Sequence, residues 1–317
     1  MTAAVGLLVY SGFALAVGPR LLVRSTAGGR APRLGIVAWQ VACWSVIGSW
    51  ILAGAVIALP SLVPVDGLGG LLHTCLVIVR QAVAPHGSRW LRLLGGAVAI
   101  LTGARVGSCL LHGLWAQRRC RSRHLAAVTM VGRRRGELDA VVVECAEPIV
   151  YCLPGWAGRV VATTGALDRL SPDQLSAVLA HERAHLRGRH HLVLGAAHAL
   201  LRAFPMVRLF TLASAHTARL VEMCADDAAA RRHSRRHVAE ALVVLADRPA
   251  PREALAASGV HTIQRVERLL TDRGPAAVTS SRLVVLAALF ASGPMLSVVA
   301  PVLVMALRHW GLCPLPR

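Results

Sequence analysis

Apolar residues gather in long runs toward the two ends of the chain, and polar residues are concentrated in the middle. Four runs have the length of a helix that crosses a bilayer: Ala3 to Leu22, Leu34 to Pro60, Leu93 to Trp115 and Leu283 to Leu307. The third of them carries Arg105 near its middle. A fifth run, Leu68 to Ala84, is shorter and is interrupted by His73 and Arg80. We therefore predict four spanning helices, with the fifth run as a membrane-surface or re-entrant helix outside.

Composition and the distribution of arginine support this arrangement. Hydrophobic residues make up 55% of the 317 residues and charged residues only 16%, below the roughly one quarter of soluble domains. The first run lacks the positive start of a signal peptide, and its basic residues follow it: Arg20, Arg24, Arg30 and Arg33. Basic loops stay in the cytoplasm. The second basic cluster then lies on the same side: Arg118, Arg119, Arg121 and Arg123. We predict a multi-pass protein of the cell membrane with a cytoplasmic middle segment.

The net charge of +19 does not by itself indicate a nucleic-acid partner. Every one of the 35 basic residues is arginine, and many lie beside the apolar runs, where they set topology and meet anionic lipid. No nucleic-acid-binding motif is present, so we expect the lipid bilayer as a partner and no direct nucleic-acid binding. The eight cysteines form no C-x-x-C pair and are expected to be free thiols in a reducing compartment. Nothing in the pattern predicts an oligomeric state.

The middle segment combines short strands with helices. Strands are predicted at Ala140 to Glu144, Pro148 to Leu153 and Arg159 to Thr163, after a basic linker at Arg133 to Gly136. Helices are predicted from Pro172 through to about Phe204, then at Val207 to Arg232, Val238 to Ala246 and Val266 to Leu270. The fold class is therefore mainly α, with about four membrane helices and an inserted small α+β domain of the zincin type. The expected domains are a membrane region at 1–115, a peptidase domain at 116–281 and a C-terminal span with a short tail at 282–317.

An H-E-x-x-H motif lies on the first of these helices. Ser171 and Gln174 form a capping box at the helix start. Residues four apart share one helical face, so His181 and His185 can direct two imidazoles at one metal ion. Glu182 lies beside them, placed to take a proton from the attacking water. The alternative is a surface helix with solvated side chains, which the capping box and a downstream acidic helix disfavour.

A catalytic zinc needs a third protein ligand, and two residues compete for this role. His191 completes the longer pattern H-E-x-x-H-x-x-G-x-x-H, but the residues after it stay apolar and helical. Glu222 is favoured, because Asp226 follows one turn later and can fix the tautomer of a ligand imidazole. The alternative is that both carboxylates form a solvated face paired with Arg219 or Arg231.

Several segments resemble the integral-membrane gluzincin peptidases. They are Tyr151 to Gly155, Val161 to Leu167, Ala180 to His191 and Val221 to Asp226. The similarity is greatest to the peptidases of the beta-lactam sensor-transducers, the penicillinase and methicillin-resistance antirepressors. It is weaker to the heat-shock and prenyl-protein membrane proteases. Unlike the sensor-transducers, the chain has only about ten residues after Leu307 and so lacks the penicillin-binding sensor domain.

The resemblance implies a role for each motif residue. One zinc ion would be bound by His181, His185 and Glu222, with Glu182 as general base and Asp226 orienting a ligand. It also implies that the strand at Arg159 to Thr163 pairs with an extended substrate. The oxyanion-stabilising residue stays open between His233, His237 and His261.

The expected function is that of a membrane-embedded zinc metalloendopeptidase. Its substrate would be a cytoplasmic or membrane-proximal protein, and the resemblance makes a transcriptional repressor or the chain itself candidates. One alternative is a non-catalytic membrane receptor or scaffold that retains a zinc site, which the intact Glu182 argues against. Another is an outward-facing protease, which follows if Leu68 to Ala84 spans the membrane.

Overall fold

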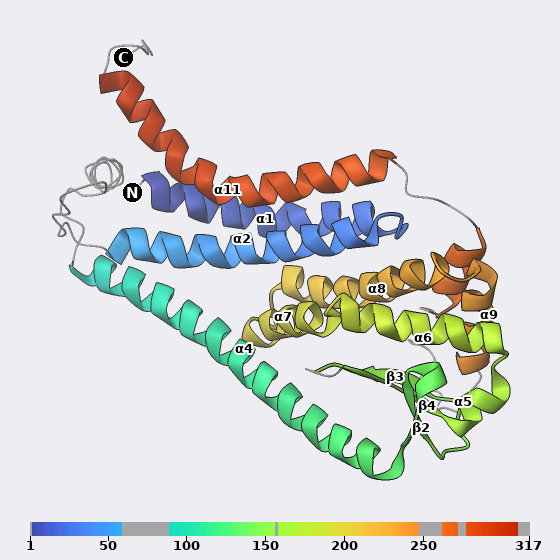
Figure 1. Cartoon of the computed structure of the whole chain (residues 1–317). Helices are drawn as coiled ribbons and strands as arrows, with labels where there is room; N and C mark the ends of the chain where they lie inside the picture. The colour runs from blue at the N-terminus through green and yellow to red at the C-terminus, as the bar shows by residue number, and fades with distance from the viewer. Residues whose placement is uncertain (1, 59–88, 156–157, 247–261, 272–276, 310–317) are drawn as a thin grey trace, which may run out of the picture.

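The structure, a computed structural model, describes residues 2–58, 89–155, 158–246, 262–271 and 277–309 (Figure 1). Its helices are α1 (Thr2–Thr26), α2 (Pro32–Ala58), α4 (Arg89–Val131), α5 (Thr164–Arg169), α6 (Pro172–Arg187), α7 (His190–Ala203), α8 (Arg208–Ala230), α9 (Arg235–Ala246) and α11 (Ala277–His309). A further helical segment covers residues 262–270. The strands are β1 (Arg133–Arg135), β2 (Ala140–Val143), β3 (Val150–Leu153) and β4 (Arg159–Thr163), with a short 3-10 helix at Gly136–Leu138. The predicted class, mainly helical with a small sheet, is confirmed.

Four of the described helices are long and apolar enough to cross a membrane: Ala3–Thr26, Pro32–Ala58, Arg89–Val131 and Val278–Ala300. They contain the predicted runs Ala3 to Leu22 and Leu93 to Trp115, and they cover Leu34 to Ala58 and Leu283 to Ala300 of the other two, which supports a membrane protein. In Figure 1, α1, α2 and α11 lie side by side, while α4 leaves this bundle at an angle and ends beside the sheet. The prediction for Leu68 to Ala84 lies outside the described residues.

Helix α4 is longer than predicted. The apolar run ends at Trp115, but the helix continues without a break to Val131, because neither glycine nor proline occurs before Gly132. The Gly132 N–H donates to the Val128 carbonyl at 2.8 Å, and a side chain at Gly132 would collide with Val141 of the sheet. The second basic cluster, Arg118 to Arg123, therefore lies on one continuous helix that joins the candidate membrane helices to the sheet.

Arg105 connects α4 to another helix. Its Nε donates a hydrogen bond to the Ala203 carbonyl at 3.0 Å. Ala203 is the last residue of α7, and carbonyls at a helix end have no partner within their own helix. A charged group in the middle of an apolar run thus has a defined acceptor.

The sheet has the order β1-β2-β4-β3, with β2 and β4 parallel and the other pairs antiparallel. One face packs against α6 through Val160, Val178 and Leu179. The other packs against the end of α4 through Val128 and Val161. Helix α6 and the end of α4 therefore enclose the sheet from opposite sides.

The expectation that the Arg159–Thr163 strand pairs with a substrate is wrong. This strand is β4, which lies inside the sheet with β2 on one edge and β3 on the other. The strand with a free edge beside α6 is β3. The predicted basic linker is also different, because Arg133–Arg135 forms β1. Its backbone pairs with β2 while all three side chains are exposed, so no apolar alternation reveals it.

The motif helix does not continue to Phe204. It ends at Arg187, and Gly188 caps it. Arg189 then takes a left-handed conformation with φ of +46°, and α7 begins at His190. A side chain at Gly188 would collide with the His190 imidazole, so the glycine allows the close approach that redirects the chain.

Helices α7 and α8 share one core with α1, α2, α4 and α11, the helices that could span a membrane. The ring of Trp39 in α2 is fully buried and stacks on His216 of α8 at 5.2 Å. Further along α2, Trp50 contacts Phe204 and Phe210 edge-on. Helix α8 is therefore packed along α2, and α7 along α4, as Figure 1 shows, rather than held apart from the candidate membrane helices.

Candidate metal centre

Helix α6 positions the two motif histidines and Glu182. The predicted capping box is present, since the Ser171 hydroxyl accepts from the Gln174 N–H and the Gln174 side chain accepts from the Ser171 N–H. The cap fixes the start of the helix, and the buried residues that follow fix its rotation. The imidazoles of His181 and His185 consequently point to one side.

The structure brings His181, His185 and Glu222 together. The two Nε2 atoms lie 3.1 Å apart, and each lies 3.6 Å from a Glu222 carboxylate oxygen. Two ligand atoms that coordinate zinc at tetrahedral angles are separated by about 3.4 Å, given zinc–ligand distances near 2.1 Å. Among the described residues, this trio is the one group of three whose ligand atoms all lie within 4.8 Å of one another. The donor set, two imidazoles and a carboxylate, fits a metal ion.

Asp226 and Arg265 form the support behind this trio. Asp226 is completely buried, and its Oδ1 lies 3.1 Å from His181 Nδ1. Arg265, from the helical segment 262–270, donates to both Asp226 oxygens at 2.7 and 2.8 Å. Its third nitrogen lies 3.1 Å from Glu222. The Arg265 guanidinium therefore holds both Glu222 and Asp226, and the alternative pairing of these two with Arg219 or Arg231 is wrong.

The charges of this cluster shift its pKa values strongly. Burial opposes the charged form of His181, but Asp226 and Glu222 outweigh it and raise the pKa of His181 to about 9. Burial also opposes the charged form of Glu222, but His181 and Arg265 lower the pKa of that carboxyl to about 2. The pKa of His185 falls to about 4 through burial and the neighbouring His181. Burial likewise opposes the charge of Asp226, but Arg265 and His181 hold the pKa of that carboxyl below its usual value. Glu222 and Asp226 are thus ionised at neutral pH, which suits a dication.

Glu182 lies close to β3 as well as to the candidate metal ligands. Burial raises its pKa, while His181 and the thiol and backbone of Cys152 lower it. Burial and the Glu182 charge raise the pKa of the Cys152 thiol to about 12, so this thiol stays protonated. Glu182 is therefore held between the metal ligands and the strand with the free edge.

The remaining histidine candidates do not join the trio. His190, which was not predicted, lies with its Nδ1 3.0 Å from the Nδ1 of His185. His191 is outside the described group of metal-ligand atoms. Within the part of the chain that the structure describes, His233 and His237 form no hydrogen bond or ion pair with the site, and His261 lies outside it.

Two arginines that contact the acids of α8 were not predicted from the sequence. Arg265 and Arg268 lie one turn apart, and they pair with the adjacent acids Asp226 and Asp227. Arg268 also donates to the Gly29 carbonyl in the turn between α1 and α2. The i, i+3 spacing of the two arginines places them on one face of a helix, which was the signal available in the sequence. This spacing does not identify the acids with which they pair.

A capped helix with two convergent imidazoles, a neighbouring carboxylate and a further carboxylate from the next long helix is the arrangement typical of a metal-dependent peptidase. The chain belongs to Peptidase family M48, because the sequence profile of that family matches residues 117–298. Membership indicates a metallopeptidase and implies a protein substrate. The family match does not confirm the narrower resemblance to the peptidases of the sensor-transducers. Comparison with curated proteins and with solved structures gave no match.

Proposed function

We propose that the protein is a membrane-bound zinc metalloendopeptidase. His181, His185 and Glu222 would hold one zinc ion, and Glu182 would be the general base. The observation that carries the proposal is the convergence of the two Nε2 atoms and the Glu222 carboxylate at 3.1 to 3.6 Å, beside a buried acid. A bound zinc ion would supply a Lewis acid that polarises the scissile carbonyl and acidifies the attacking water.

The side chains around the ligands would each have a separate role in catalysis or in holding the zinc ligands. Glu182, whose pKa is raised by burial, takes a proton from the attacking water and delivers it to the leaving amine. Asp226 Oδ1 lies 3.1 Å from His181 Nδ1, and this negative charge favours a proton on Nδ1, which leaves Nε2 as the ligand atom. Arg265 fixes Asp226 and neutralises part of the negative charge next to Glu222.

The free edge of β3 is the proposed binding surface for an extended substrate. The Ile149 carbonyl accepts from the Thr163 N–H, and antiparallel strands bond at alternate residues. The backbone groups of Val150 and Cys152 therefore point away from β4, toward the open side. A substrate strand added there would pass next to Glu182.

The substrate is proposed to lie close to the membrane surface. The turn between α1 and α2 receives hydrogen bonds from Arg268 at Gly29 and from Arg219 at Ala27. A side chain at Gly29 would collide with Met223, the neighbour of Glu222. The metal centre is thus level with the end of two helices that can span a membrane. The arginine pattern favours the cytoplasmic side, and a tag at Gly136 should then be reached by reagents only from the cytoplasm.

The test is peptide-bond cleavage by the purified full-length protein. Glu182→Gln should abolish cleavage of an unfolded protein such as casein while the bound zinc stays at one per chain. Equal cleavage by the wild type and this variant would contradict the proposal. The alternative, a non-catalytic receptor or scaffold, is not favoured by the family match and would show no zinc-dependent cleavage. A repressor or the chain itself as the natural substrate has no support beyond the resemblance.

A further inference from the structure

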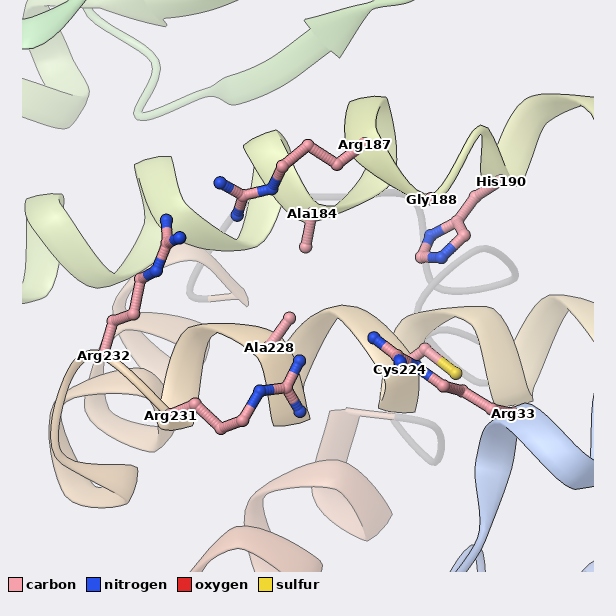
Figure 2. A pocket seen from close by; sticks show the side chains of 9 residues that line it. All are labelled: Arg33, Ala184, Arg187, Gly188, His190, Cys224, Ala228, Arg231 and Arg232. Atoms are coloured by element: carbon pink, nitrogen blue, oxygen red, sulfur yellow. The ribbon is translucent and has the colours of Figure 1, made fainter.

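A cationic cavity of about 310 Å³ lies between α6 and α8, next to the metal centre but outside the trio of ligands (Figure 2). Its arginines come from three places: Arg33 from α2, Arg187 from α6, and Arg231 and Arg232 from the turn directly after α8. In Figure 2 the small side chains of Ala184 and Ala228 face each other in the middle, with the arginines around them. The space is therefore lined by guanidinium groups and floored by residues too small to fill it.

The positive charge of this cavity is not compensated by the protein. Across the described ranges, none of the four guanidinium groups forms an ion pair or a side-chain hydrogen bond, and no carboxylate lines the cavity. Like charges held this close favour an anion that offers several acceptor oxygens.

The position of Arg33 indicates where such an anion comes from. Arg33 is the second residue of α2 and follows the turn between α1 and α2, at the end of two helices that can span a membrane. Lipid headgroups are at this level, and arginine forks suit phosphate oxygens. The cavity volume is at the small end of ligand sites, which fits one headgroup rather than an acyl chain.

We propose that this cavity binds a phosphate-bearing anion, with an anionic phospholipid headgroup at the membrane surface as its source. The arginines of α6 and of the turn after α8 contact the phosphate, and Arg33 closes the side next to the membrane. This binding site is separate from the zinc ligands and needs neither the metal nor cleavage. The proposal can therefore be tested independently of the peptidase activity.

The test measures binding of short-chain phosphatidic acid to the full-length protein in a neutral detergent, by native mass spectrometry. Dioctanoylglycerol is the matched lipid without phosphate. The variant Arg187→Gln/Arg231→Gln should bind phosphatidic acid about tenfold more weakly or worse, because each arginine near a phosphate contributes substantially. Arg33→Gln, on another helix, should weaken binding in the same direction and serves if the double variant does not fold.

The control Arg134→Gln/Arg135→Gln removes the same charge from β1, whose side chains are exposed. It should leave affinity within about twofold. Inorganic phosphate distinguishes the two sources of the anion. If inorganic phosphate displaces phosphatidic acid at a similar concentration, free phosphate is sufficient for binding. If it does not displace the lipid, the result supports the lipid headgroup. Equal weakening in the control and cavity variants, unchanged affinity in the cavity variants, or equal binding of dioctanoylglycerol would overturn the proposal.

Discussion

Asp226→Asn removes the charge on which the support of the metal centre depends. The Asp226 carboxylate is completely buried, accepts two hydrogen bonds from Arg265, and lies 3.1 Å from His181 Nδ1. Asparagine keeps the shape but offers one oxygen and carries an N–H₂ group that cannot accept from either partner. The substitution therefore leaves the Arg265 charge buried with only Glu222 as its partner, and it frees the tautomer of His181.

Two magnitudes follow from this geometry. Breaking a buried ion pair by removing one partner costs about 3–5 kcal/mol, and we expect about 3 because Glu222 still pairs with Arg265. For a domain of this size that lowers the midpoint of thermal unfolding by roughly 6–12 °C. Loss of the group that orients a metal-ligating histidine reduces metal affinity by about 10- to 100-fold.

Both effects are measured on the full-length protein in detergent, by thermal unfolding of the metal-free form and by zinc competition with a chelator. Asp227→Asn is the matched control. Its carboxylate pairs with Arg268 at 2.8 Å and is partly exposed, so stability should fall by only about 1–2 kcal/mol and zinc affinity should stay within about threefold. Wild-type zinc affinity in Asp226→Asn, or an equal loss in both variants, would refute the reasoning.

Two further predictions concern pH and the substrate edge. In the metal-free protein Asp226 and Glu222 overcome burial and raise the pKa of His181 from 6.5 to about 9, so its protonated form stabilises the fold below pH 6.5. That contribution is lost as pH rises from 6.5 to 9, and thermal unfolding should show the decline in the chelator-treated wild type but not in His181→Asn. Val150→Pro removes a backbone donor on the open edge of β3 without breaking the ladder, so KM should rise about tenfold while zinc content is unchanged. Unchanged KM would exclude substrate pairing at this edge.

The parts of the molecule that sequence predicted are those governed by local rules. The capping box and the i, i+4 spacing of the histidines depend only on neighbouring residues, so the motif helix, its start and the convergence of His181 and His185 could be predicted. The long apolar runs are likewise visible by length alone. Glu222 was accessible because Asp226 repeats one turn later on the same helix.

The parts that sequence missed depend on contacts between distant segments. Arg265 is 39 positions from Asp226, and arginines nearer in sequence were equally plausible partners until the packing was known. The break after Arg187 depends on the left-handed Arg189, which no residue pattern specifies for an arginine. β4 could not be recognised as an interior strand, because pairing order is a property of the whole sheet.

The most direct measurement of the central claim is the zinc content of purified Glu222→Gln and His191→Asn protein at limiting free zinc. Glu222 and the two motif histidines are the proposed zinc ligands. Loss of a residue that only orients a ligand lowers metal affinity by up to about 100-fold, so Glu222→Gln should lower zinc affinity by more than that. His191→Asn should retain one zinc per chain, as the wild type does. Retention of zinc by Glu222→Gln together with its loss from His191→Asn would contradict the proposed centre and favour three histidine ligands.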